Sequence, residues 1–202
     1  MRALLVPVKS FDSAKARLAP ALGANERSAL ARELASQVLA ARASVPAFVV
    51  CDDGDVARWA EHAGATVLWT PGLGLSGAVA EGVARLGARG FDLVVVAHAD
   101  LPLASDLSGF GTPGIVTLAP DRRLDGTNVA AVPTSSGFRF AYGPGSFSRH
   151  RAEAARIGLA CRLVYDSSLA VDIDLPEDLA ILEALRGRGA HGASPGRLQR
   201  AP

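Results

Sequence analysis

The sequence has few of the residues that mark several common classes of protein. It contains two cysteines among 202 residues, in no CxxC pair, which excludes a disulfide framework and a cysteine-based zinc site. Only 5% of the residues are aromatic and the net charge is +1, which argues against a basic, base-stacking nucleic-acid surface. No apolar run approaches the ~20 residues of a membrane span, and the segment MRALLVPVK becomes polar too soon for a signal peptide. We therefore expect a cytoplasmic protein with neither a membrane nor a nucleic-acid partner.

Lysine is scarcer still. Of the 21 basic residues, 19 are arginines, and the two lysines, Lys9 and Lys15, both lie in the first fifteen residues. A flexible ammonium group and a planar guanidinium group are not interchangeable at every site. The distribution directs attention to residues 9–17, although chance is the simpler explanation.

Apolar runs alternate with amphipathic stretches along the first half of the chain, which predicts an α/β fold with a mostly parallel central sheet. The expected strands are Arg2–Val8, Ala47–Cys51, Thr66–Trp69 and Phe91–Ala97, with helices at 25–43, 55–62 and 76–86. In the second half, strands are expected at 115–119, 128–132, 138–142, 163–165 and 169–173, and helices at 146–157 and 176–185. We expect one domain over residues 1–186 and, because residues 187–202 have no periodicity, a disordered tail.

Ligands of parallel α/β sheets bind at the carboxyl ends of the strands, so the loops there are searched first. Lys9, Lys15 and Arg17 follow the first strand and suit a bound polyphosphate, although no Walker A pattern is present. A solvated basic loop explains the same spacing. The segment 72–77 has the letters GxGxxG, yet it follows the third strand and no acid ends the next one, so we expect backbone approach to a nucleotide at Gly74 rather than hydride transfer.

Three carboxylates occupy comparable positions. Asp100 follows an apolar strand, and Asp172 and Asp174, two residues apart, share one side of an extended segment. Carboxylates together with substrate phosphates are the usual ligands of magnesium. Turn formation explains Asp100 equally simply, and a helix N-terminus explains Asp174. Together the three acids predict a magnesium site that faces the basic loop.

Two further segments are either turns or an anion site. They are Asp125-Gly-Thr-Asn128 and the stretch from Tyr142 to Phe147, in which Ser146 begins an expected helix. The histidines have no metal-binding spacing, and for His98 and His150 a supporting role is favoured over catalysis. Neither a GxSxG elbow nor a Cys/His pair indicates acyl chemistry.

Taken in order, these segments resemble one family, the 2-phospho-L-lactate/phosphoenolpyruvate guanylyltransferases of deazaflavin coenzyme (coenzyme F420) biosynthesis. The resemblance covers about residues 2–185 and rests on VPVK, AKARL, HADLPL, APD, GTN, FAYGPGSF, RH and DIDLPEDL. It implies a nucleotidyltransferase-type, Rossmann-like (GT-A-like) domain. It also implies that GMP passes from GTP to a phosphorylated three-carbon acid with Mg²⁺, and that pyrophosphate leaves.

The resemblance also implies roles for particular residues. The mechanism needs no protein nucleophile, because the attacking phosphate is already anionic, so positioning and charge neutralisation carry it. The implied residues are Asp100, Asp172 and Asp174 for the metal, Thr127, Gly143 and Ser146 for the phospho-acid, Lys15 and Arg17 for the triphosphate and catalysis, and Lys9 and Gly74 near the nucleotide.

The chain departs from the family at Ser76, where an asparagine is usual. The stretch from Leu103 to Gly114 is also shorter than the family leads us to expect. The expected acceptor is phosphoenolpyruvate, then 2-phospho-L-lactate, with 3-phosphoglycerate open. Two alternatives remain from other classes: a metal-dependent glycosyltransferase, because Asp172-Ile-Asp174 is also a DxD sequence, and a non-catalytic nucleotide-binding protein of the same fold. A homodimer and a hand-off to the next enzyme of the pathway are left open.

Overall fold

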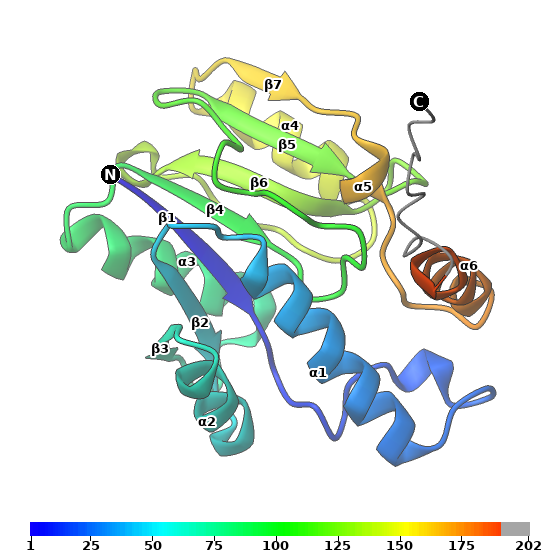
Figure 1. The fold of residues 1–202 in the computed structure, drawn as a ribbon. Helices are drawn as coiled ribbons and strands as arrows, with labels where there is room; N and C mark the ends of the chain where they lie inside the picture. Colours follow the sequence, from blue (N-terminus) through cyan, green and yellow to red (C-terminus); the bar gives the residue numbers. More distant parts are fainter. Residues whose placement is uncertain (191–202) are drawn as a thin grey trace, which may run out of the picture.

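The computed structural model describes residues 1–190 as a seven-stranded sheet between layers of helices (Figure 1). The strands β1 to β4 run parallel, β6 is antiparallel to both of its neighbours β4 and β5, and β7 runs parallel to β5. The spatial order is β3-β2-β1-β4-β6-β5-β7. The predicted mostly parallel α/β sheet is confirmed. The strands are β1 (Arg2–Pro7), β2 (Ala47–Cys51), β3 (Thr66–Trp69), β4 (Leu93–Ala97), β5 (Val116–Pro120), β6 (Thr127–Pro133) and β7 (Cys161–Leu163).

Helices cover both faces of this sheet. The helices α1 and α2 pack on one face, and α3 and α4 pack on the other (Figure 1). The α-helices are α1 (Ala24–Ala40), α2 (Gly54–His62), α3 (Gly74–Ala88), α4 (Ser146–Arg156), α5 (Ser167–Ala170) and α6 (Asp178–Ala190), with short 3₁₀ turns η1 (Ala16–Leu18) and η2 (Thr134–Ser136). No helix in residues 1–190 is both long enough and apolar enough to cross a membrane. Both cysteines are free thiols, as the sequence predicted.

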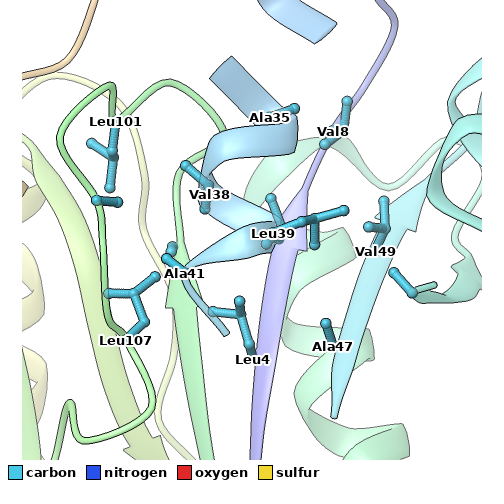
Figure 2. Close-up of a cluster of buried hydrophobic side chains, with 14 of the residues drawn as sticks. Leu4, Val8, Ala35, Val38, Leu39, Ala41, Ala47, Val49, Leu101 and Leu107 are labelled. Atoms are coloured by element: carbon cyan, nitrogen blue, oxygen red, sulfur yellow. The ribbon is translucent and has the colours of Figure 1, made fainter. Parts of the chain in front are cut away.

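The central strands are apolar on both faces because both faces are covered. Along β1, Leu4 packs in the cluster under α1 while the next residue, Leu5, packs in the cluster under α3. Figure 2 shows Val38 and Leu39 of α1 above Leu4 and the neighbouring strand β2. Each fully buried leucine contributes roughly 1.5–3 kcal/mol relative to an exposed one. This packing fixes where the ends of β1, β2 and β4 lie, and the site is built on those ends.

The antiparallel direction of β6 has a consequence for the site. A strand that runs against its neighbours begins at the edge where they end. Thr127, the first residue of β6, therefore lies at the same edge as the loops that follow β1 and β4. The backbone of His98 confirms this proximity, because its N–H donates to the carbonyl of Asn128 at 2.9 Å.

Two expected strands are absent from the second half, and each has a physical reason. The segment 138–142 joins no ladder, because both sides of β6 are already occupied by β4 and β5; the rings of Phe138 and Phe140 pack together instead, 5.1 Å apart. Residues 167–170 form α5 rather than the start of a strand over 169–173. The carboxylate of Asp166 accepts the N–H of Ser168 at 2.8 Å and so starts a helical turn there.

Boundaries moved by a few residues elsewhere. The helix expected to start at Asn25 starts at Ala24, where Glu26 accepts the Gly23 N–H at 2.7 Å. The strand expected at 163–165 is β7, two residues earlier. The last helix, α6, continues to Ala190, four residues past the expected domain end at residue 186. The remainder of the expected tail, 191–202, lies outside the described residues.

Candidate active site

Two neighbouring clefts open at the edge of the sheet where the parallel strands end. The first, here the charged cleft, has a volume of about 260 Å³ and is lined by Lys9, Lys15, His98, Asp100 and Asp174 among others. The second, here the glycine-loop cleft, has a volume of about 590 Å³ and lies between the ends of β2 and β3 and the start of α3. Both clefts share the residues Pro7 to Lys9 and Leu75 as lining, so they adjoin. This is the place where α/β sheets bind their ligands.

An ion pair joins the basic loop to the loop after β4. The Lys15 Nζ lies 2.6 Å from Asp100 Oδ2, and the two side chains are 9% and 21% exposed. Burial is the largest single influence on the pKa of Asp100 and raises it, but the charge and hydrogen bond of Lys15, together with His98 and a backbone amide, lower the pKa below its usual value, so the carboxyl group is ionised. Lys15 has a left-handed backbone, with φ 54° and ψ 35°, which costs a non-glycine residue roughly 1–2 kcal/mol. Strain of this kind is typical of functional segments.

The charged cleft also contains polar atoms that the protein does not satisfy. Asp100 Oδ1 and His98 Nε2 are buried without a hydrogen-bond partner in the described part of the chain. Burial raises the pKa of Asp172, and the negative charge of Asp100 raises it further. The carboxylates of Asp100 and Asp172 are thus close enough to repel each other. One ammonium group, that of Lys15, pairs with Asp100. Such a site attracts an additional cation.

The third predicted acid has a different partner. Asp174 Oδ2 lies 2.7 Å from the Arg17 guanidinium, so each cation of the AKARL segment is paired with one acid. Across residues 1–190, no group of three His, Cys, Asp or Glu side chains is arranged to hold a metal ion. The predicted grouping of Asp100, Asp172 and Asp174 into a three-acid cluster is therefore not found. Asp174 is paired with Arg17 instead, a partner that the spacing of the acids could not reveal.

Asp178 organises the segment that carries Asp172 and Asp174. Its side chain is 1% exposed, and its Oδ2 accepts the N–H groups of Asp174 at 2.9 Å and Leu175 at 2.7 Å. Its Oδ1 pairs with Arg122. The Ile173 N–H donates to the Asp100 carbonyl at 3.2 Å, which ties the segment to the charged cleft. Burial raises the pKa of Asp178, but the two amide donors and Arg122 lower it below its usual value.

We expect Asp178→Ala to lower the free energy of unfolding by about 2–4 kcal/mol, because charged hydrogen bonds and a buried ion pair are lost together. Since the folded pKa is depressed, this contribution is present above the ordinary pKa of about 4 and is lost as the pH falls through the lower folded value. Urea unfolding at neutral and at acidic pH measures both effects. The neighbouring, exposed Glu177 is the control: Glu177→Ala should change stability by less than about 0.5 kcal/mol. Equal effects of the two variants would contradict the role of Asp178.

The predicted acceptor residues meet around the start of β6 and α4. Thr127 and Ser146 are 1% and 2% exposed. The Thr127 N–H donates to Ser146 Oγ at 3.0 Å, and Thr127 Oγ1 lies 3.0 Å from His150 Nδ1. Gly143, with φ +104°, precedes α4 in a conformation that favours glycine. The structure thus brings Thr127 and Ser146 into direct contact.

The backbone N–H groups at the start of α4 already have hydrogen-bond acceptors within the protein. The Gly145 N–H donates to Asp125 Oδ1 at 3.0 Å, and the Phe147 N–H donates to the Asp125 carbonyl at 3.0 Å. The Ser146 N–H donates to the Gly143 carbonyl at 3.0 Å. Ser146 begins α4 as expected, but these amides are already paired. An anion here would depend on side-chain hydroxyls rather than on the helix terminus.

Three other positions named in the sequence lie in or near these clefts or are held by a neighbouring segment. Gly74 starts α3 with φ +63°, lines the glycine-loop cleft, and has no atom within 4 Å of where a Cβ would lie. Ser76, at the position where the family usually has asparagine, accepts the Tyr142 N–H at 3.0 Å. Lys9 is exposed and lines both clefts, and it makes no ion pair within residues 1–190. Only proximity therefore supports a nucleotide contact for Lys9.

The sequence predicted a supporting role for His150, but not the partners through which Asp178, Asp125 and His150 hold these groups in place. Asp178, Asp125 and His150 each pair with groups that are distant in sequence or with backbone amides, so no spacing rule identifies their partners. One signal was available for Asp178: an acid four residues after Asp174 at a helix start can accept amides of the preceding turn. For His150, the supporting role was predicted from its place beside the segment from Tyr142 to Phe147, without its partners.

Comparisons with known proteins identify the family of the chain. A sequence model of the family described as "Guanylyl transferase CofC like" matches residues 1–194. The chain is 38% identical over 200 residues to phosphoenolpyruvate guanylyltransferase of Sphaerobacter thermophilus, covering 94% of this chain and 95% of that protein. It is 33% identical over 197 residues to 2-phospho-L-lactate guanylyltransferase of Methanothermobacter thermautotrophicus, covering 93% and 86%.

Solved structures share the fold at low sequence identity. A nucleotidyl transferase from Methanothermobacter matches with a TM-score of 0.66 and 14% identity, over 94% of this chain and 99% of that one. Glucosyl-3-phosphoglycerate synthase from Mycobacterium tuberculosis matches with a TM-score of 0.54 and 16% identity, over 92% and 75%. At such identities the likeness concerns the arrangement of strands and helices alone.

Proposed function

Because the chain belongs to the family of CofC-like guanylyltransferases, we propose that it transfers GMP from GTP to phosphoenolpyruvate and releases pyrophosphate, as a step of coenzyme F420 biosynthesis. Guanylyl transfer follows from membership of the family, whereas the choice of phosphoenolpyruvate as the acceptor is our proposal. The relatives named as phosphoenolpyruvate guanylyltransferases include the one at 38% identity, whereas the 2-phospho-L-lactate enzyme is 33% identical. The ion pair of Lys15 with Asp100 is the structural observation that supports the guanylyl-transfer chemistry, because it places a cation suited to phosphate beside an acid suited to a metal.

The nucleotide half of the site uses the two clefts. The glycine-loop cleft has the larger volume, about 590 Å³, and its lining near Gly74 lets a nucleoside approach the backbone. The triphosphate then extends into the charged cleft, where Lys15 and Arg17 supply positive charge. Both cations are paired with acids in the structure. Phosphate oxygens are stronger partners for these cations, so Lys15 and Arg17 share or leave their carboxylates when GTP binds.

The residues present fit a magnesium ion. Asp100 has a buried oxygen without a partner, and Asp172 has a raised pKa because burial and a second carboxylate disfavour its charge. Magnesium is usually held by one or two carboxylates together with substrate phosphates, so a cluster of three acids is not required. Asp100 and Asp172 are the residues that would hold it, whereas Asp174 faces Arg17 in the structure. When bound, the ion would neutralise charge on the transferring phosphates.

The reaction needs little covalent chemistry from the protein. An oxygen of the acceptor phosphate forms a bond to the α-phosphorus of GTP, and the bond from that phosphorus to the bridging oxygen of the β-phosphate breaks. Pyrophosphate leaves with the electron pair. The attacking oxygen is already anionic, so no general base is required, and Lys15 and Arg17 act by orienting the triphosphate and stabilising its charge. We expect Thr127 and Ser146 to hold the acceptor.

A pyrophosphate-release assay tests the proposal. Each nucleoside triphosphate is combined with phosphoenolpyruvate, 2-phospho-L-lactate and 3-phosphoglycerate, with Mg²⁺ or with EDTA, and the product mass is measured. We expect GTP with phosphoenolpyruvate and Mg²⁺ to be the most active combination and EDTA to abolish the release. No release with any phospho-acid would refute the function. Turnover of a nucleotide sugar without pyrophosphate would support the glycosyltransferase alternative, which the pairing of Asp174 with Arg17 disfavours.

The remaining expectations about cellular context are proposals as well. A cytoplasmic location accords with the two free thiols, Cys51 and Cys161. A homodimer and transfer of the product to the next enzyme of the pathway are proposed as well. Size-exclusion chromatography of the purified chain tests the oligomeric state.

A further inference from the structure

His150 is the most completely enclosed ionisable side chain near the acceptor residues. It is 0% exposed and is surrounded by aromatic rings, with Phe138 at 5.6 Å, Phe140 at 6.1 Å and Tyr142 at 5.0 Å between centroids. Both ring nitrogens nevertheless have polar partners. The Ala141 N–H donates to Nε2 at 2.9 Å, and Nδ1 lies 3.0 Å from the Thr127 hydroxyl oxygen.

The backbone amide decides where the imidazole proton lies. An amide N–H can only donate, so Nε2 of His150 must present its lone pair to Ala141. A neutral imidazole then carries its proton on Nδ1, and that N–H donates to Thr127 Oγ1. Burial lowers the pKa of His150 to about 4, with the charge of Arg149 acting in the same direction, so the ring is neutral at physiological pH.

The direction of the Thr127 hydroxyl follows from this. Its oxygen accepts from His150, so its own hydrogen points to a different partner. No acceptor for that hydrogen exists among residues 1–190, since the only other bond of Thr127 to this cluster is made by its backbone N–H, which donates to Ser146 Oγ. This series of hydrogen bonds runs from the Ala141 N–H through His150 to Thr127. It leaves the Thr127 hydroxyl as a donor without a partner in the described residues, at the proposed acceptor site.

We propose that His150 is a positioning residue that turns the Thr127 hydroxyl into an obligatory hydrogen-bond donor for an anionic oxygen of the phospho-acid. This inference rests on the proposed function and adds a determinant of acceptor binding. Thr127 is 1% exposed, so its hydroxyl serves only a ligand seated directly against it. A donor in a fixed direction favours carboxylate and phosphate oxygens and disfavours groups that must themselves donate.

Two substitutions distinguish the role of Nδ1 of His150 from the role of Nε2. In His150→Asn the side-chain amide nitrogen lies near the position of Nδ1, so it can still donate to Thr127, but the acceptor for Ala141 is lost. In His150→Gln the amide oxygen reaches the position of Nε2 and still accepts from Ala141, but the donor to Thr127 is lost. Both variants remove the ring and leave similar space in the aromatic cluster. A purely structural role would be rescued by glutamine, and a positioning role by asparagine.

Steady-state kinetics of the full chain, with GTP and the phospho-acid varied separately, give the test. We expect His150→Gln to raise the KM for the phospho-acid about ten-fold or more, as for one lost charged hydrogen bond, with the KM for GTP unchanged. His150→Asn should remain close to wild type. Equal effects of the two variants, or rescue by glutamine rather than asparagine, would overturn the proposal.

A second measurement does not depend on catalysis. ¹⁵N NMR of protein labelled at its histidines reports the tautomer directly, and we expect the Nδ1-protonated form of His150. The signal of His150 is assigned because it disappears in His150→Gln. The Nε2-protonated form would refute the inference even if both variants misfold. The wild-type assay separates the two levels: if wild type releases no pyrophosphate, the proposed function fails, whereas a wrong tautomer in an active enzyme refutes only the role of His150.

Discussion

Asp100→Asn is expected to abolish Mg²⁺-dependent pyrophosphate release, with turnover reduced by at least about 10²–10³-fold, the size of effect seen when one transition-state electrostatic contact is removed. The substitution removes the negative charge from the one carboxylate that both faces Lys15 and has an unpartnered oxygen. It therefore weakens the magnesium site and the placement of the triphosphate at the same time. Near-normal turnover would exclude Asp100 from the metal site.

The controls for this variant address folding. Asp100→Asn leaves the Lys15 ammonium, whose side chain is 9% exposed, without its carboxylate, so some loss of stability is expected. A thermal unfolding curve separates that loss from the loss of activity at a temperature where the variant is folded. Asp106→Asn is the matched control, because Asp106 lies in the same loop region, is exposed and bonds only to Ser108. Its activity should equal that of wild type.

Lys15→Ala is expected to lower kcat/KM for GTP by about ten-fold or more, as for the loss of one charged contact to phosphate. Lys9→Ala is the matched control in the same loop, because Lys9 is exposed and lines the same cleft without a carboxylate partner in the described residues. A larger effect of Lys9→Ala than of Lys15→Ala would reverse the assignment. Unchanged kinetics in both variants would make the position of the two lysines an accident of composition.

Lys15→Arg tests whether charge alone suffices. A guanidinium group is larger and planar, and the pocket beside Asp100 holds an ammonium group that is nearly buried. We expect this variant to recover only part of the activity lost in Lys15→Ala. Full recovery would show that the charge, and not the compact shape of lysine, is what the triphosphate requires.

The first half of the fold was predictable because its strands are buried on both faces and are separated by amphipathic helices. A run such as Leu93–Ala97 has few other interpretations once helices are expected on either side. The second half was harder because its outcome depends on which sheet edges are free. Nothing in residues 138–142 reveals that β6 is already flanked by β4 and β5. The Asp166 cap that makes α5 a helix is a local signal, and it was overlooked.

The candidate site was predictable as a set of residue types at strand ends, and less so as a set of partners. Lys15 and Asp100 are 85 residues apart in sequence, and only the parallel order of β1 and β4 brings their loops together. The pairing of Arg17 with Asp174 depends on the path of the chain after α5, which no periodicity encodes. The role of His150 depends on the direction of one backbone amide, which is set by tertiary packing.

The reversed strand β6 divides the substrate-binding edge into two parts of different origin. On the proposed function, the loops that follow β1, β2, β3 and β4 bind the nucleotide, and the start of β6 and the start of α4, where Thr127 contacts Ser146, bind the acceptor. Substitutions around Thr127, Gly143 or Ser146 can alter the acceptor without disturbing the strands that carry Lys15 and Asp100. Such a modular layout allows an ancestral enzyme to exchange one small acid for another in few mutational steps. Grafting the segment 125–150 from a relative with a different acceptor should therefore transfer acceptor preference while GTP use is inherited unchanged.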